Sequence, residues 1–177
     1  MKKIYGCNLL EIVITAAILL LAGSAGAVNQ INSCTTISSP GDYVLTASII
    51  NSGASSCINI TSSDVIFDGA GFTIDGVIES ASRISDHGVN VHNQATALTN
   101  VTVRNLNVTG WYIGIYYNNT EYGIIHGNKV SENVLGILLV YSNNNNLSGN
   151  NLSDNTGGIL VRSSSNNNLS GNSVMGR

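Results

Sequence analysis

The stretch Asn144-Asn-Asn-Leu-Ser-Gly-Asn150 recurs unchanged at residues 166–172, one period of 22 residues further along the chain. The same period runs from residue 103 to the last residue, and it places like residues in columns. Three of these columns are Val108, Val130, Leu152 and Val174; Ile115, Ile137 and Ile159; and Gly114, Gly136 and Gly158. Self-similarity at a fixed period marks a stacked repeat array, in which each unit buries its apolar face against its neighbours.

Each repeat is predicted to be a coil of short strands rather than a pair of helices. Apolar side chains alternate at Ile113, Ile115 and Tyr117, which is the period of a strand. The Asn, Ser and Gly clusters between such runs break helices and favour turns. The sequence therefore predicts an all-β parallel β-helix, a solenoid with 22-residue coils.

Stacked coils bring like residues to about the 4.8 Å spacing of neighbouring strands. Asn128, Asn150 and Asn172 are therefore expected to form a side-chain amide ladder. The glycine column that starts at Gly114 indicates either a positive φ or a close approach of the backbone to its neighbour.

The repeats also resemble a known family. Gly136-Ile-Leu-Leu-Val140, followed by Asn145-Asn-Leu-Ser-Gly-Asn-Asn-Leu152, is similar to the repeats of right-handed parallel β-helix proteins. These include the NosD-type (periplasmic copper-binding) family and the wider group of carbohydrate-binding proteins and sugar hydrolases. Residues 34–76 resemble the N-terminal part of archaeal secreted members. The resemblance covers most of the chain after residue 30, and it implies the fold rather than a particular function.

The N-terminus indicates export. Lys2 and Lys3 precede an apolar run over residues 12–22 and then Ala25-Gly-Ala27, the pattern of a secretory signal with its cleavage site. Two alternatives are a prepilin-type signal, because Glu11 stands five residues after Gly6, and an uncleaved anchor helix over residues 12–28. We therefore expect residues 1–27 to be a signal peptide or membrane anchor. The protein would be secreted or at the cell surface, and this segment would be its only contact with a membrane.

Charge and cysteine content each allow a further prediction. Without residues 1–27 the chain keeps five basic and nine acidic side chains, and the basic ones are scattered, which gives no electrostatic reason to bind nucleic acid. The same cleavage leaves Cys34 and Cys57, and an even number of cysteines in an exported chain predicts a disulfide bond.

The domain organisation follows the repeats. Residues 28–57, with a Pro40-Gly41 turn, are expected to form an irregular N-terminal cap, and residues 58–177 the β-helix. Residues 77–87 break the period and are expected to loop out. The last coil stops in mid-repeat at Arg177, so the β-helix looks incomplete at its C-terminus. Its open end is expected to self-associate or to meet further repeats.

Carboxylates are the candidate catalytic groups. Glycoside hydrolysis needs two of them about 5 to 9.5 Å apart, and the acids available are Asp64, Asp68, Asp75 and Asp86. Asp68 and Asp75 are each followed by Gly, which is first of all a turn signal. We therefore assign no catalytic residue.

Metal binding is also not predicted. His87, His92 and His126 could join Asp86 as ligands, but they lack a close spacing such as His-x-His. The resemblance to NosD-type proteins therefore does not assign copper to this chain, and we expect no metal or other cofactor.

Aromatic residues are the candidate ligand contacts. Trp111, Tyr112, Tyr116, Tyr117 and Tyr122 fall within one coil, and aromatic rings stack on sugar faces and are enriched at recognition surfaces. The strand alternation places Tyr117 in the core. Trp111 and Tyr116 are expected to point outward and to contact a glycan.

Asn-x-Ser/Thr sequons make N-glycosylation a further possibility in an exported chain. Four of them are the candidate sites, at Asn59, Asn100, Asn107 and Asn118. The sequons at Asn146 and Asn168 occupy one repeat column, so the repeat itself explains them.

Together these features favour an exported, non-catalytic β-helix module with a structural or adhesive role. Its partner would be carbohydrate or another cell-envelope polymer. A polysaccharide lyase or hydrolase is the first alternative. An accessory protein for the maturation of a copper enzyme is the second.

Overall fold

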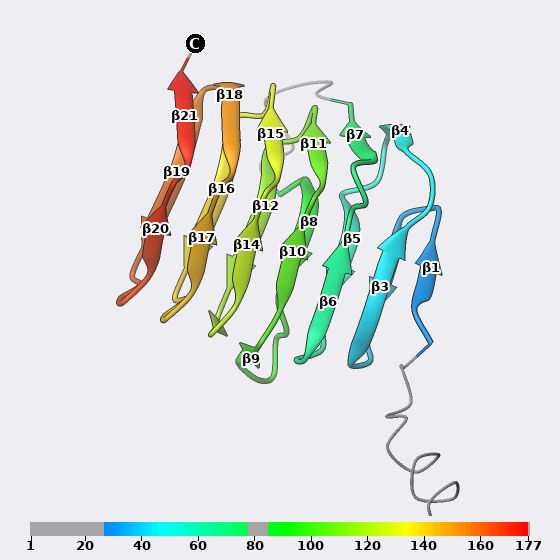
Figure 1. Ribbon diagram of the computed structural model, residues 1–177, viewed down its shortest axis with the longest axis horizontal. Helices are drawn as coiled ribbons and strands as arrows, with labels where there is room; N and C mark the ends of the chain where they lie inside the picture. The colour runs from blue at the N-terminus through cyan, green and yellow to red at the C-terminus, as the bar shows by residue number, and fades with distance from the viewer. Residues whose placement is uncertain (1–26, 78–84, 177) are drawn as a thin grey trace, which may run out of the picture.

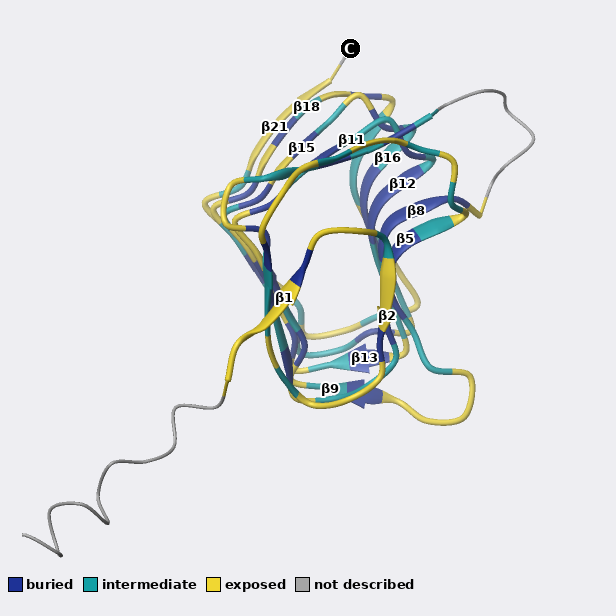
Figure 2. Ribbon diagram, turned by 90° about the vertical axis from the view of Figure 1, so that its right-hand side faces the viewer, coloured by how far each residue is buried: buried dark blue, intermediate teal, exposed yellow. Residues whose placement is uncertain are grey.

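The computed structural model describes residues 27–77 and 85–176, and the strands of these residues form three parallel sheets around a shared core (Figures 1 and 2). Sheet A contains β1 (Asn29–Ile31), β3 (Gly41–Leu45), β6 (Val65–Asp68), β10 (Thr102–Arg104), β14 (Ile124–His126), β17 (Asn146–Ser148) and β20 (Asn168–Ser170). Sheet C contains β4 (Ile49–Ser52), β7 (Thr73–Gly76), β11 (Asn107–Thr109), β15 (Lys129–Ser131), β18 (Asn151–Asn155) and β21 (Ser173–Gly176). Sheet B contains β2 (Thr35–Ile37), β5 (Ser56–Ile60), β8 (His87–Val91), β12 (Ile113–Asn118), β16 (Leu135–Val140) and β19 (Gly157–Arg162). A small fourth sheet pairs β9 (Leu98–Thr99) with β13 (Thr120–Glu121).

From β3 onward the chain passes through sheets A, C and B in turn and then starts the next coil. From β10 onward the strands pair at the predicted 22-residue period, as in Val103, Ile125 and Leu147 of sheet A, with one register shift between β18 and β21 at Ser153/Asn155. The earlier coils vary in length: Phe67 pairs with Val103 across a larger step in the sequence, and Ile31 pairs with Leu45 across a smaller one. The all-β solenoid and its repeat are thus confirmed.

The core consists of the predicted apolar columns. Ile115 and Ile137 are fully buried in neighbouring coils, and Ile159 continues the column in the next one. Tyr117 is also fully buried, as expected, and its hydroxyl donates a hydrogen bond to the carbonyl of Val101 at 3.0 Å. Each coil therefore covers the apolar face of the coil before it.

The glycine column reflects a close approach of coils rather than a positive φ. A Cβ atom on Gly114 would lie 2.7 Å from the carbonyl oxygen of Gly136 and 2.8 Å from Cγ1 of Val130. A Cβ atom on Gly136 would be equally close to Leu152, which lies in the next coil. Neighbouring coils come this close where sheet C meets sheet B, so only glycine, which has no Cβ atom, fits at these positions.

Asparagine side chains connect the coils at the corners of the solenoid. Asn150 is 1% exposed, and its Oδ1 accepts hydrogen bonds from the backbone N–H and the Nδ2 of Asn128 at 3.1 and 3.0 Å. Its own Nδ2 donates to the carbonyl of Ile125 and to Oδ1 of Asn172, both at 2.9 Å. The predicted ladder of Asn128, Asn150 and Asn172 is therefore confirmed.

The same pattern recurs at the two other corners. Asn133 and Asn155 connect sheets C and B, where the backbone N–H of Asn133 donates to Oδ1 of Asn155 at 2.9 Å. Asn145 and Asn167 connect sheet B to the following strand of sheet A by an equivalent bond of 2.8 Å. Three asparagine ladders thus satisfy the buried backbone groups where the chain turns from one sheet to the next.

The N-terminal end of the solenoid is already built from paired strands. β1 and β2 pair with β3 and β5, so residues 28–57, expected to be an irregular cap, contribute strands to the sheets. Cys34 and Cys57 form the predicted disulfide bond, and Cys57 is fully buried. The bond connects the first coil to β5 beneath it.

Two predicted segments lie wholly or partly outside the described residues. The signal or anchor segment falls there except for residue 27, and so do residues 78–84 of the predicted loop. His87, the last residue of that predicted loop, instead begins β8 and is 9% exposed. Within residues 27–77 and 85–176 there is no helix long and apolar enough to cross a membrane.

We expect Asn150→Ala to lower the free energy of unfolding by about 3 kcal/mol, because it removes the side-chain acceptor of the buried Asn128 N–H and the side-chain donor to the carbonyl of Ile125. The neighbouring Asn151 is exposed, so Asn151→Ala should change stability by less than about 0.5 kcal/mol. Urea denaturation of both variants measures the difference. Equal effects would show that the ladder does not stabilise the corners.

The disulfide prediction can be tested by thiol labelling. Purified protein, unfolded without a reductant, should show no reactive thiol at Cys34 or Cys57 in a peptide map. Reduction should cost about 3 kcal/mol for a loop closed across 23 residues of sequence. Two labelled cysteines in the unreduced protein would contradict the bond.

Candidate functional site

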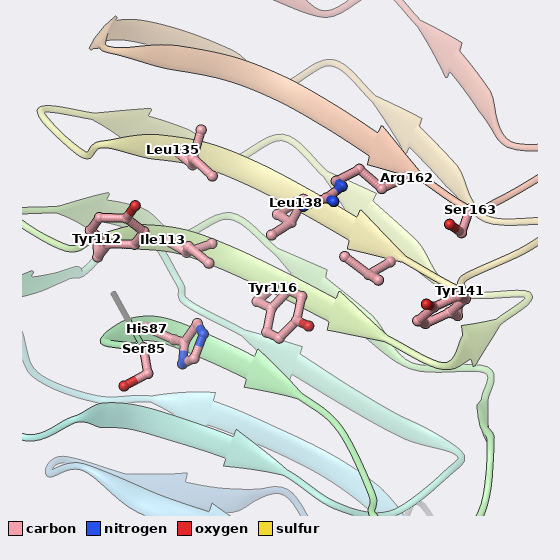
Figure 3. Close-up of a pocket in the computed structure, with 11 residues that line it drawn as sticks. Ser85, His87, Tyr112, Ile113, Tyr116, Leu135, Leu138, Tyr141, Arg162 and Ser163 are labelled. Carbon is pink, nitrogen blue, oxygen red and sulfur yellow. The ribbon is translucent and has the colours of Figure 1, made fainter. Parts of the chain in front are cut away.

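A groove of about 540 Å³ lies on the outer face of sheet B (Figure 3). Strands β8, β12, β16 and β19 provide its floor, and the turns next to them provide its rims. We call it the sheet-B groove. Its lining residues are Ser85, His87, Tyr112, Ile113, Tyr116, Leu135, Leu138, Val140, Tyr141, Arg162 and Ser163.

The floor of the groove is apolar, although it faces outward. Leu138 pairs with Tyr116 on one side and with Leu160 on the other. Between these neighbours, 8% of the Leu138 surface is exposed. The outer face of sheet C differs, because the equivalent column there is Asn107, Lys129 and Asn151. An apolar strip beside such a polar face marks a place where a partner can bind.

His87 lies on β8, at one side of the groove, and is held by two contacts. Its ring stacks on Tyr116 with centroids 5.0 Å apart and planes 12° apart. Its Nδ1 lies 3.1 Å from the hydroxyl of Ser56 on β5. Burial lowers the pKa of His87 to about 4, against the opposing effect of the Asp86 carboxylate. The imidazole is therefore neutral at physiological pH.

Tyr116 and Arg162 set the polarity of the groove. Burial raises the pKa of Tyr116, while the Arg162 guanidinium on β19 acts in the opposite direction. Among the lining residues that the structure describes, Arg162 carries the charge and none is a carboxylate. The groove therefore combines a phenol, a guanidinium and an apolar floor.

Tyr112 and Tyr141 stand at the two ends of the groove, with Tyr116 between them (Figure 3). Tyr141 is 62% exposed and adopts a positive φ in the turn after β16. Tyr112 was among the aromatic residues noted in the sequence, but Tyr141 and Arg162 were missed as site residues. Tyr141 and Arg162 lie one and two coils after the coil of Tyr112. Writing the sequence in rows of 22 residues would have placed Tyr141 in the column of Asn119 and Arg162 in the column of Asn118.

The expectation that Trp111 points outward is wrong. Its side chain is 2% exposed, and its Nε1 donates a hydrogen bond to the carbonyl of Ile74 at 3.2 Å. Trp111 occupies the corner column that continues as Asn133, whose Oδ1 accepts from the Trp111 backbone N–H at 2.9 Å. Corner side chains point inward, so Trp111 cannot contact a ligand on the outer face, whereas Tyr116 faces outward as expected.

The candidate aspartates have structural partners. Burial alone would raise the pKa of Asp68, but hydrogen bonds from the Ala70 N–H, Asn105 and Arg104, with the Arg104 charge, outweigh it and hold the pKa below its usual value. Asp75, on sheet C, accepts a hydrogen bond from Thr109 at 2.7 Å.

The two remaining acids do not join them. Asp64 accepts from the Nδ2 of Asn100 at 2.9 Å. Asp86 is 9% exposed beside His87, next to sheet B. The four carboxylates therefore do not form one site.

The histidines are also apart. His87 belongs to sheet B and His126 to sheet A, where its Nδ1 lies 3.0 Å from the Ser148 hydroxyl. Nδ1 of His92 is buried without a hydrogen-bond partner in the described part of the chain. Within residues 27–77 and 85–176, no three His, Cys, Asp or Glu side chains gather in a way that could hold a metal ion.

Three of the predicted glycosylation sites already use their side-chain amides. Asn59 Oδ1 accepts from Asn90 at 3.1 Å, Asn100 donates to Asp64, and Asn107 Nδ2 donates to the carbonyl of Gly71 at 2.8 Å. Asn118 is half-buried on β12. Glycan attachment at these residues stays a prediction.

Residues 28–177 match the family model described as periplasmic copper-binding protein (NosD). Neither the curated proteins nor the solved structures gave a match. The family description implies copper, but the described residues do not fit it. The cysteines at 34 and 57 are bonded to each other, Met175 lies 60% exposed at the end of the solenoid, and the histidines stand singly. The side chains of residues 27–77 and 85–176 therefore provide no copper site.

The neutral, stacked His87 makes stability depend on pH. Its folded-state pKa of about 4 lies below the unfolded value of 6.5, so the unfolded chain binds the proton first. The free energy of unfolding should be constant above pH 6.5 and fall by about 3 kcal/mol as the pH drops to 4. In His87→Gln this loss should disappear, whereas His126→Gln, at an exposed histidine, should retain it. Urea titrations at pH 7 and pH 4.5 measure both; an unchanged slope in His87→Gln would contradict the assignment.

Proposed function

The chain belongs to the NosD family of parallel β-helix proteins, and we propose that it is an exported, non-catalytic module that binds a carbohydrate chain of the cell envelope. The observation that carries this proposal is the sheet-B groove, an aromatic and apolar strip on a solenoid whose other outer columns are rich in Asn, Ser and Thr. In this role the solenoid is the rigid scaffold and the groove is the adhesive surface.

The groove chemistry suits a sugar polymer. Tyr112, Tyr116 and Tyr141 can stack against the C–H faces of successive sugar rings, because aromatic side chains combine a large apolar face with a polar tip. The hydroxyls of the tyrosines and of Ser163 and the Arg162 guanidinium supply hydrogen bonds to sugar oxygens. The groove follows the strands from Tyr112 to Tyr141 and is open to solvent, so a chain of several sugar units could lie along it (Figure 3).

The positions of the acidic side chains favour a binding role over a lyase or hydrolase activity. Hydrolysis of a glycosidic bond uses two carboxyl groups facing one another across the substrate. The described residues that line the groove include none, and Asp68 and Asp75 are engaged with Arg104 and Thr109 on two other sheets. The Ser56–His87 pair has the composition of a nucleophile and its base. However, its histidine ring is packed against Tyr116, which favours a supporting role for it.

The location proposed is the outer side of the cytoplasmic membrane. The family is described as periplasmic, and the Cys34–Cys57 disulfide indicates an extracytoplasmic compartment. A position at the cell surface, where an envelope polymer is within reach, is our proposal. A role in copper-enzyme maturation has no support from the described side chains beyond the family description.

We expect the purified protein to bind at least one envelope or extracellular polysaccharide in affinity electrophoresis, without releasing sugars. Tyr116→Ala should weaken that binding about tenfold by removing the central ring. Tyr122→Ala is the matched control, because Tyr122 is 58% exposed on another part of the surface. The proposal fails if the two variants bind alike. It also fails if the protein releases sugars and this release is lost in Asp68→Asn or Asp75→Asn.

A further inference from the structure

Arg162, the last residue of β19, brings a positive charge to the sheet-B groove. Its column on the outer face of sheet B is Asn118, Val140 and Arg162, so the two preceding coils carry neutral side chains at this position. The Arg162 side chain extends from β19 back toward Leu138 (Figure 3). Its charge acts on the pKa of Tyr116, which lies two strands away. The guanidinium therefore lies over the groove floor.

The Arg162 guanidinium has no carboxylate partner within residues 27–77 and 85–176. Arg104 on sheet A differs, because its Nε donates to Asp68 at 2.9 Å. An anion that met Arg162 would do so beside Leu138 and Val140, which also line the groove. An ion pair formed beside such apolar side chains is screened less than one in open water. The described fold does not use this charge, which leaves it for a ligand.

Acidic side chains flank the opposite edge of sheet B, where its strands begin. Asp86 directly precedes β8, Glu132 lies in the turn before β16, and Asp154 lies on β18, just before β19. Because β19 is six residues long, roughly 16 Å separate its first residue from Arg162. That distance exceeds the screening length of about 8 Å at physiological ionic strength. The groove thus has a positive end at Arg162 and an acidic border at its other end.

The positive end of the groove also offers neutral donors. Tyr141 and Ser163 line it near Arg162 (Figure 3), and their hydroxyls can donate to the same anion. Glu121, an acid on this side of sheet B, lies on β13 outside the lining residues, and its carboxylate accepts a hydrogen bond from Nδ2 of Asn143 at 3.4 Å. A guanidinium matches a planar carboxylate with two parallel hydrogen bonds. The ligand that fits this end is therefore a sugar that carries a carboxylate.

We propose that the sheet-B groove binds a polysaccharide in which uronic acids alternate with neutral sugars, with Arg162 pairing to a uronic acid carboxylate and Tyr116 packing on the neighbouring neutral ring. The inference rests on the carbohydrate-binding role proposed above and specifies its ligand class. One carboxylate per pair of sugars suits the single cation. A carboxylate on every sugar would place further charges over Ile113 and Leu135 and toward the acidic border, where no partner charge compensates them among the described residues that line the groove.

Affinity electrophoresis against hyaluronan and unsulfated chondroitin, which both alternate a uronic acid with a neutral sugar, tests the ligand class. The protein should bind at least one of them, and about tenfold more weakly once its carboxyl groups are reduced to alcohols. Polygalacturonate, with a carboxylate on every sugar, should bind less tightly. Arg162→Gln should lose about tenfold on the acidic polymer and nothing on the reduced one. Lys129→Gln is the matched control, because it removes one positive charge from the exposed outer column of sheet C.

The outcomes separate this inference from the binding role itself. The comparison of acidic and reduced polymers on the unmodified protein depends on no variant, and circular dichroism melting checks that each variant has folded. Equal affinities of Arg162→Gln and Lys129→Gln, or tighter binding of polygalacturonate or dextran sulfate, would overturn the inference. Binding to a neutral polysaccharide that needs Tyr116 but not Arg162 would overturn it and leave the binding role in place. No Tyr116-dependent binding to any polymer would overturn both.

Discussion

The structure depends on what happens to the backbone where the chain leaves one sheet for the next. Buried N–H and C=O groups need partners there, and strand pairing does not supply them. The asparagine of the following coil does: Oδ1 of Asn150 accepts from the Asn128 backbone, and Nδ2 reaches the carbonyl of Ile125. Because each amide spans two coils, the ladders keep the coils that they join at one length, and that length is the 22-residue period.

This constraint explains what could be predicted from the sequence. The fold, the apolar columns and the ladder at Asn150 follow from spacing alone. The orientation of Trp111 did not follow, because strand alternation does not extend through a corner. There Trp111 takes the place that Asn133 holds one coil later and turns inward. The Ser56–His87 pair was also out of reach, because the early coils have no common period that would align β5 with β8.

The candidate site also depends on the regular stacking of the coils, but through the outward-facing positions of their strands. Once the ladders and the inward columns hold a coil, the outward positions of its strands are free to vary. On sheet B they become Tyr116, Leu138 and Leu160 in successive coils, and a groove results although none of the three strands has changed its path. Stacking therefore converts substitutions 22 residues apart into one continuous surface. A motif search within any single repeat could not detect it.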